Sequence, residues 1–218
     1  MVRQPNSPRR PALKPACDTK QKLIGTALEL IWKSSYGSVS VDDICKAADV
    51  KKGSFYHFFP SKADLAIAAL EESYASMKPE FDRVFSPESP PLRRFEDLAE
   101  FFYQFQQAAA EKYGKVCGCP CATLGCEMAG QEAGIVAKTR EIAQRQERYY
   151  QSALRDLVAD GLLPPITDVK AKAEEIYAYF IGQTMSARIQ NSLDPLKRDL
   201  KSGLMRTIGA TQKAPLPA

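Results

Sequence analysis

The chain of 218 residues is 44% hydrophobic and 26% charged, a composition that is ordinary for packed globular proteins and argues against a disordered chain. No apolar run approaches the roughly 20 residues of a membrane-spanning helix, and no apolar segment follows the basic N-terminus as in a secretory signal, so we expect a cytoplasmic protein without membrane contact. The net charge of +4 is uneven: residues 1–62 hold 11 Lys and Arg against 5 Asp and Glu, whereas residues 63–218 hold 19 against 21. This asymmetry favours an anion such as DNA phosphate as the partner of the N-terminal part, but a solvated basic surface would explain it equally well.

The first 17 residues contain four prolines and four basic residues without apolar periodicity, so we expect a disordered basic arm. From Asp18 to about Gly209 apolar residues recur at helical spacing, and no stretch alternates as a strand would. The sequence therefore predicts an all-α fold of about nine helices. The first is expected over about 19–36, capped by Asp18 and ended by Gly37.

Two short helices are predicted next. Ser40–Asp43 resembles a capping box in which Asp replaces the usual Glu, and it opens a helix that ends near Ala48. A tight turn leads to a second short helix over about 52–58, in which Phe55 and Phe59 are spaced to face inward. A longer helix follows over about 62–85, capped by Ser61. This arrangement is a helix-turn-helix, whose second helix enters the DNA major groove.

The sequence of residues 52–65, KGSFYHFFPSKADL, resembles the signature of TetR-family regulators, and residues 42–50, DDICKAADV, are similar to that family's first short helix and turn. The likeness covers about residues 19–70. It implies an N-terminal three-helix head that binds double-stranded operator DNA and a helical body for ligand binding and dimerisation. Carried over by position, it implies DNA contacts from Ser40, Val41, Lys52, Gly53, Ser54, Tyr56 and His57, and a phosphate contact from Lys62. Val41 departs from the family's pattern, in which a hydroxyl side chain is common.

The rest of the chain is predicted to form the body. Ser86–Pro91 has the composition of a linker between head and body. Five more helices are expected over about 92–112, 123–131, 132–160, 168–193 and 195–209. We therefore divide the chain into a disordered basic arm (1–17), a helix-turn-helix DNA-binding domain (18–62), a ligand-binding and dimerisation domain (63–209) and a flexible tail (210–218).

Two apolar stripes in the last helices favour a homodimer. One stripe consists of Ala173, Ile176, Phe180, Gln183, Ala187 and Gln190, and the other of Leu196, Leu200, Leu204 and Ile208. Gly182 and Ser186 would permit close approach of helices. The family resemblance implies a four-helix bundle with the partner, and a two-fold operator needs recognition helices about 34 Å apart. The alternative is that both stripes pack inside one subunit.

A small-molecule effector is expected between the helices of the body. The candidate lining residues are Phe101, Phe102, Phe105, Met128, Tyr149, Tyr177 and Met185. Each is also the kind of residue that fills an ordinary core. No cluster of charged residues indicates what the effector is.

Four of the six cysteines, Cys117, Cys119, Cys121 and Cys126, fall within ten residues. They could simply pack in a helix-entry loop. They could instead form a thiol sensor, because Cys121 would precede a helix that begins near Thr123 and whose dipole lowers a thiol pKa. Three thiolates could also bind a soft metal ion, although the spacing lacks the paired C-x₂-C of structural zinc sites.

No set of catalytic residues is apparent, since His57 is the only histidine and has no serine, cysteine and carboxylate arranged around it in sequence. We therefore expect no enzyme activity, no cofactor and no bound metal. The sequence predicts a repressor that leaves its operator when a small molecule binds in the body. The alternative is a TetR-like regulator triggered by thiol oxidation, by electrophiles or by a soft metal at Cys117–Cys126.

Overall fold

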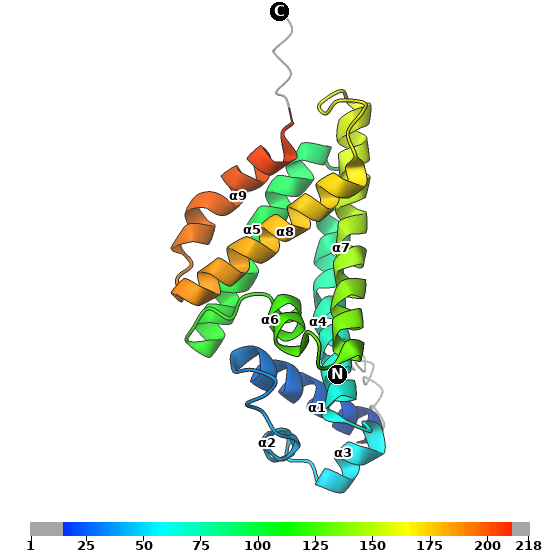
Figure 1. Ribbon diagram of the computed structural model, residues 1–218, viewed down its shortest axis with the longest axis vertical. Helices are drawn as coiled ribbons and strands as arrows, with labels where there is room; N and C mark the ends of the chain where they lie inside the picture. The colour runs from blue at the N-terminus through cyan, green and yellow to red at the C-terminus, as the bar shows by residue number, and fades with distance from the viewer. Residues whose placement is uncertain (1–14, 211–218) are drawn as a thin grey trace, which may run out of the picture.

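The computed structural model describes residues 15–210, which form nine α-helices and no strand (Figure 1). The predicted all-α fold is confirmed. The helices are α1 (Pro15–Lys33), α2 (Val41–Ala48), α3 (Lys52–Phe58), α4 (Lys62–Val84), α5 (Pro91–Tyr113), α6 (Pro120–Met128), α7 (Ala133–Ala159), α8 (Val169–Gln190) and α9 (Asp194–Ile208).

The three-helix head lies at one end of the molecule, and α4 continues from it into the body beside the long α7 (Figure 1). The head core buries Leu23, Ile44 and Phe55 completely, together with Leu65 from the beginning of α4. Further along α4, Phe81 belongs to the body core instead. One helix therefore contributes to both cores and connects the head to the body.

Two helices begin earlier than the sequence predicts. The first begins at Pro15 and not after Asp18, and it ends at Lys33, so that neither Asp18 nor Gly37 caps it. The sixth begins at Pro120 and not near Thr123. Both starts place proline in the first turn, where its missing N–H leaves no hydrogen bond unmade. The predicted arm is therefore helical from residue 15, while residues 1–14 and 211–218 lie outside the described residues.

The predicted linker Ser86–Pro91 does not separate head from body. It joins α4 to α5, and Phe85 before it and Phe95 after it pack edge to face in the body core. The segment is a loop of the body, at the end remote from the head (Figure 1). The prediction that its prolines and serines interrupt the helices is correct. Composition alone does not show whether such a break lies between two domains or inside one.

The interpretation of the two apolar stripes as a dimer surface is wrong. Ala173, Ile176, Phe180 and Ala187 of α8 are buried in the core of their own subunit, and so are the four apolar residues of α9. They pack α8 and α9 together and against α5 and α7. Close packing of α8 on α9 depends on Gly203, because a Cβ there would lie 2.0 Å from the hydroxyl of Tyr179.

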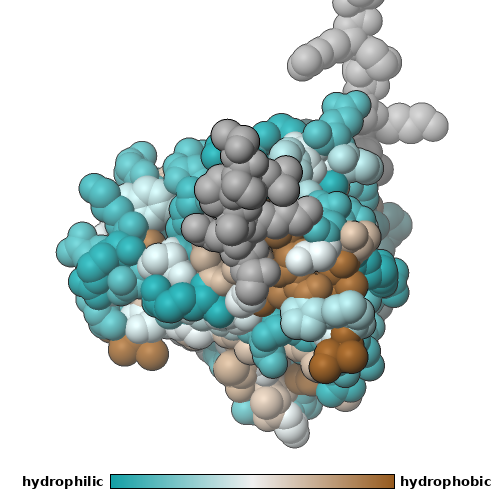
Figure 2. Space-filling view, turned by 90° about the horizontal axis from the view of Figure 1, so that it is seen from above, coloured by the Kyte–Doolittle hydropathy of each residue, from teal (hydrophilic) through white to brown (hydrophobic). Residues whose placement is uncertain are grey.

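The face of the molecule seen in Figure 2 is mostly hydrophilic, with hydrophobic residues gathered in separate groups. Across residues 15–210, no helix combines the length and apolarity needed to cross a bilayer.

Candidate functional site

The second short helix, α3, has one buried and one exposed side. Phe55 and Phe59 are 0% and 4% exposed, which confirms that they face inward and hold the helix in the head core. On the other side Lys52, Tyr56 and His57 are exposed, Tyr56 at 52%. Gly53 is also exposed, and a Cβ there would meet no atom within 4 Å. The exposed side therefore carries hydrogen-bond donors and, at Gly53, a position where another molecule can come close to the helix backbone.

The helix before it, α2, begins with the predicted capping box. The Ser40 hydroxyl accepts from the Asp43 N–H (3.1 Å), and the Asp43 carboxylate accepts from the Ser40 N–H (2.9 Å) and hydroxyl (2.6 Å). These bonds hold the pKa of the Asp43 carboxyl below its usual range. Because the Ser40 hydroxyl proton is already donated to Asp43, Ser40 orients α2 in this structure. Val41, the next residue, is half-buried.

An ion pair joins the two short helices. Lys52 Nζ lies 2.8 Å from Asp42 Oδ1, and both side chains are more than half exposed. The hydrogen bond to Asp42 raises the pKa of Lys52. An exposed pair of this kind contributes little to stability. Lys52 is thus free to exchange the carboxylate for another anion.

Lys62 braces the loop between α1 and α2. Its ammonium donates to the carbonyls of Tyr36 (2.9 Å) and Val39 (3.0 Å) and lies 3.9 Å from the centre of the Tyr36 ring. Partial burial lowers its pKa. Two of its three N–H donors are therefore committed to the head itself.

A small, mostly apolar cavity lies in the body between α4, α5, α6, α7 and α8. No charged side chain lines it. Its lining residues are Met77, Phe102, Phe105, Gln106, Cys119, Pro120, Cys121, Gln146, Tyr177, Phe180, Ile181 and Thr184. An apolar cavity with a few polar groups is the usual form of a small-molecule site.

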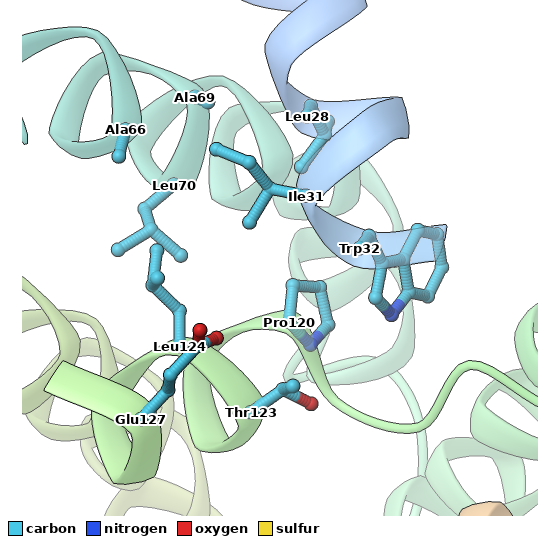
Figure 3. Close-up of a pocket in the computed structure, with 10 residues that line it drawn as sticks. All are labelled: Leu28, Ile31, Trp32, Ala66, Ala69, Leu70, Pro120, Thr123, Leu124 and Glu127. Atoms are coloured by element: carbon cyan, nitrogen blue, oxygen red, sulfur yellow. The ribbon is translucent and has the colours of Figure 1, made fainter. Parts of the chain in front are cut away.

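Head and body meet at α6 and α8. Glu127 of α6 accepts hydrogen bonds from the backbone N–H groups of Tyr36 (2.8 Å) and Gly37 (2.7 Å). Arg188 of α8 donates to the carbonyls of Ser34 and Cys117, and so joins the end of α1 to the loop before α6. Helices α1, α4 and α6 enclose a small apolar crevice, which Glu127 borders (Figure 3). The first turn of α6 thus lines the body cavity, and its last turn holds the head through Glu127.

Comparison with known proteins identifies the family to which this architecture belongs. Residues 23–69 match the family model "Bacterial regulatory proteins, tetR family", and residues 91–202 match "Tetracyclin repressor-like, C-terminal domain". The chain is 32% identical to the transcriptional regulator AcuR of Cereibacter sphaeroides over 88% of each chain. The chain belongs to the TetR family. It is therefore a DNA-binding transcriptional regulator and not an enzyme.

Two further similarities agree with this TetR-family assignment. The HTH-type transcriptional repressor NemR of Escherichia coli K12 is 25% identical over 84% of this chain and 90% of its own. The crystal structure of a regulatory protein TetR from Rhodobacter sphaeroides superposes with a TM-score of 0.73 at 30% identity, covering 88% of this chain and 97% of that one.

The candidate effector residues are divided among several places in this TetR-type body. Phe102, Phe105 and Tyr177 line the cavity. Phe101 packs against Phe81 and Phe105 beside it. The other three do not line it: Tyr149 hydrogen-bonds Asp82 in an outer groove between α4 and α7, Met128 is buried in the head cluster, and Met185 contacts the Thr123 hydroxyl.

The cysteines do not form a common ligand set. No group of three or more metal-binding side chains gathers within residues 15–210. Cys117 and Cys121 are buried, Cys119 is half-buried and Cys126 is exposed. The expectation of a lowered pKa at Cys121 is wrong, because the hydrogen bond of its thiol to Cys119 and its burial both raise that pKa. Cys119 is the N-cap, where a hydrogen bond from Cys121 lowers its pKa, whereas the same bond raises that of Cys121.

Several residues of these sites were not predicted, among them four with polar or charged side chains. Gln106 and Gln146 line the cavity, and Glu127 and Arg188 join head to body. For Gln106 and Gln146 the sequence offers one signal, a polar side chain on the apolar face of a predicted helix. In the structure these side chains are 2% and 6% exposed. Glu127 and Arg188 carry no such signal, because their partners in the head lie 90 or more residues away in the sequence.

Proposed function

We propose that this protein is a homodimeric transcriptional repressor, acting in the cytoplasm, that leaves its operator when a small molecule binds in the body cavity. The observation that carries the proposal is the two-sided α3, with aromatic side chains locked into the head and donors exposed to solvent. A recognition helix needs both properties, because base contacts require a fixed position and an open surface. The name of the relative NemR, a repressor, supports repression over activation.

We propose that the DNA-binding domain is residues 18–62, and that α3 supplies most of the DNA contacts. Lys52, Tyr56 and His57 are exposed donors, and Gly53 lets the backbone approach a phosphate. Ser54 of α3 and Val41 of α2, the other two residues of the predicted set, are half-buried. For Ser40 and Lys62 we propose a supporting role, since their donors already hold α2 and the α1–α2 loop.

The ligand-binding and dimerisation domain, residues 63–209 in this proposal, would dimerise through the outer face of α8. Ile189 is 82% exposed there, and a Cβ on Gly182, seven residues earlier on the same face, would meet no atom within 4 Å. An exposed large apolar residue beside a small one permits close packing of two helices. A dimer would present two copies of α3 to successive major grooves.

Release by an effector would be a shift between two arrangements of the heads. Occupants of the cavity touch α6 through Cys119 and Pro120, and α6 binds the α1–α2 loop through Glu127. In one arrangement the two heads fit successive major grooves, and in the other they do not. A ligand that binds the second arrangement more tightly lowers the affinity for DNA, and its affinity difference between the two arrangements limits the size of the effect.

Footprinting on the promoter of the protein's own gene and its neighbours tests the proposal. We expect protection of two half-sites centred about one helical turn, or 34 Å, apart. Deletion of the gene should raise expression of a reporter driven by the protected promoter. Absence of protection at low salt would contradict DNA binding, and lower reporter expression in the deletion strain would show an activator.

A further inference from the structure

The cavity in the body contains an acceptor without a donor. Gln106 is 2% exposed, and its Oε1 is buried with no hydrogen-bond partner. Its Nε2 donates to the carbonyl of Gly118 at 3.2 Å, which fixes the orientation of the amide. Folding removes this oxygen from water without replacing the lost hydrogen bond, so a ligand that donates to it gains more than the same contact would give in solvent.

Two other polar groups line the same cavity without a protein partner. Gln146 is 6% exposed, and neither its amide nor the hydroxyl of Tyr177 forms a hydrogen bond with the described residues. The rest of the wall is mainly aromatic and aliphatic, and Phe102 and Phe180 lie with their ring centres 4.6 Å apart. Because no Asp, Glu, Lys, Arg or His lines the cavity, a charged ligand would lose its hydration without gaining a counter-charge.

The Gly118 carbonyl also accepts a hydrogen bond from the head. Trp32 Nε1, near the end of α1, donates to it at 2.9 Å. The neighbouring residue Phe105, which lines the cavity, stacks on the Trp32 ring with centres 5.6 Å apart. Gly118 has a φ of +70°, and a Cβ there would press on Arg188 at 3.2 Å. Two adjacent residues of α5 therefore line the cavity and connect it to Trp32: Phe105 stacks on the tryptophan ring, and Gln106 shares its hydrogen-bond acceptor, the Gly118 carbonyl.

We propose that the effector is a small uncharged molecule with an O–H or N–H donor that binds Gln106 Oε1, and that its signal reaches the head through the Gly118 carbonyl shared by Gln106 and Trp32. Movement of the Gln106 amide toward the ligand changes the hydrogen bond to Gly118 and with it the position of Trp32. The inference rests on the proposed function, since it gives the effector its chemical class.

The test uses Trp32, the only tryptophan in the chain. Its indole N–H gives one resonance in a ¹⁵N-edited NMR spectrum, which reports on the Gly118 bond. The probes are phenol, toluene, benzoate and benzylammonium, which share a ring but differ in donor and charge. We expect phenol to shift this resonance saturably and to bind at least about tenfold more tightly than each of the others.

Three variants separate ligand binding from the transfer of the signal to the head. Gln106→Leu should remove the preference for phenol over toluene, whereas Gln107→Leu, an exposed neighbour that hydrogen-bonds Glu111, should keep it. Trp32→Phe should bind phenol as the parent does, measured by ligand-observed NMR, but release promoter DNA less on addition of phenol. Equal binding of phenol and benzoate, or an unchanged preference in Gln106→Leu, would overturn the inference.

These titrations need no DNA, so their failure is distinct from failure of the proposed function. A protein that binds promoter DNA and is released by a charged compound would retain the proposed function and refute this inference. A protein that binds phenol through Gln106 but binds no promoter would contradict the proposed function, while the preference of the cavity for an uncharged donor would stand.

Discussion

At the scale of single residues, Phe55 and Tyr56 are neighbours in sequence with opposite surroundings. The first is completely buried and the second is 52% exposed. We expect Phe55→Ala to lower the free energy of unfolding by about 3–5 kcal/mol, as for other large buried side chains. Tyr56→Ala should leave that free energy nearly unchanged and weaken binding to promoter DNA. Chemical denaturation and fluorescence anisotropy measure the two effects, and a destabilised Tyr56→Ala would mean that α3 is not two-sided.

In the proposed complex, Asp42 would compete with DNA for Lys52. Its carboxylate lies 2.8 Å from the Lys52 ammonium on the exposed side of the helix-turn-helix. Asp42→Asn removes this competitor and one repulsive charge near the phosphates, so DNA affinity should rise several-fold at low salt and less at high salt. Asp160→Asn makes the same change of charge on exposed Asp160 at the end of α7 and is the control. Equal effects of the two variants would mean that Asp42 has no local role.

At the scale of elements, Ser40 determines where α2 begins. Ser40→Ala removes its side-chain capping bonds and should lower the free energy of unfolding by about 1 kcal/mol. The pKa of Asp43 should rise toward its ordinary value. Because the folded state lowers this pKa, the stabilisation is present at neutral pH and is lost as the pH falls through the lowered value. NMR titration of Asp43 in the parent and the variant measures the change, and an unchanged pKa would contradict the capping role.

The link between α6 and the α1–α2 loop can be tested in the same way. Glu127→Ala removes the acceptor for the N–H groups of Tyr36 and Gly37. Amide exchange at these two positions should accelerate by at least about tenfold, while amides buried inside α7 keep their protection. Unchanged exchange at Tyr36 would show that the loop is held by Lys62 alone.

The sequence predicted those elements whose ends are determined locally. The capping box at Ser40 and the cap at Ser61 are contacts between residues three apart, and the turn at Asp49 uses a left-handed residue, φ 54°, that ends α2. The starts of α1 and α6 were missed because proline can begin a helix as well as end one. The apolar face of α8 was assigned to a partner because periodicity shows that a face is buried but not what buries it.

At the scale of the whole molecule, the proposed dimer makes a specific demand on α8. Ile189→Glu places a charge on the exposed face that we assign to the partner, whereas Ile166→Glu makes the same change at a residue that is 94% exposed in the loop after α7. Sedimentation should show a monomer for the first variant and the parental dimer for the second. Operator affinity should fall with the dimer, since one head contacts only one half-site. A dimeric Ile189→Glu would place the interface elsewhere.

The central claim is that the exposed side of α3 binds DNA, and the salt dependence of binding to a promoter fragment tests it most directly. The logarithm of the affinity should fall linearly with the logarithm of the salt concentration, and Lys52→Ala should reduce the slope by about one, the loss of one phosphate contact. The control, Lys170→Ala, removes an exposed lysine at the beginning of α8 and should keep the parental slope. A parental slope and affinity in Lys52→Ala, or no binding at low salt, would contradict the claim.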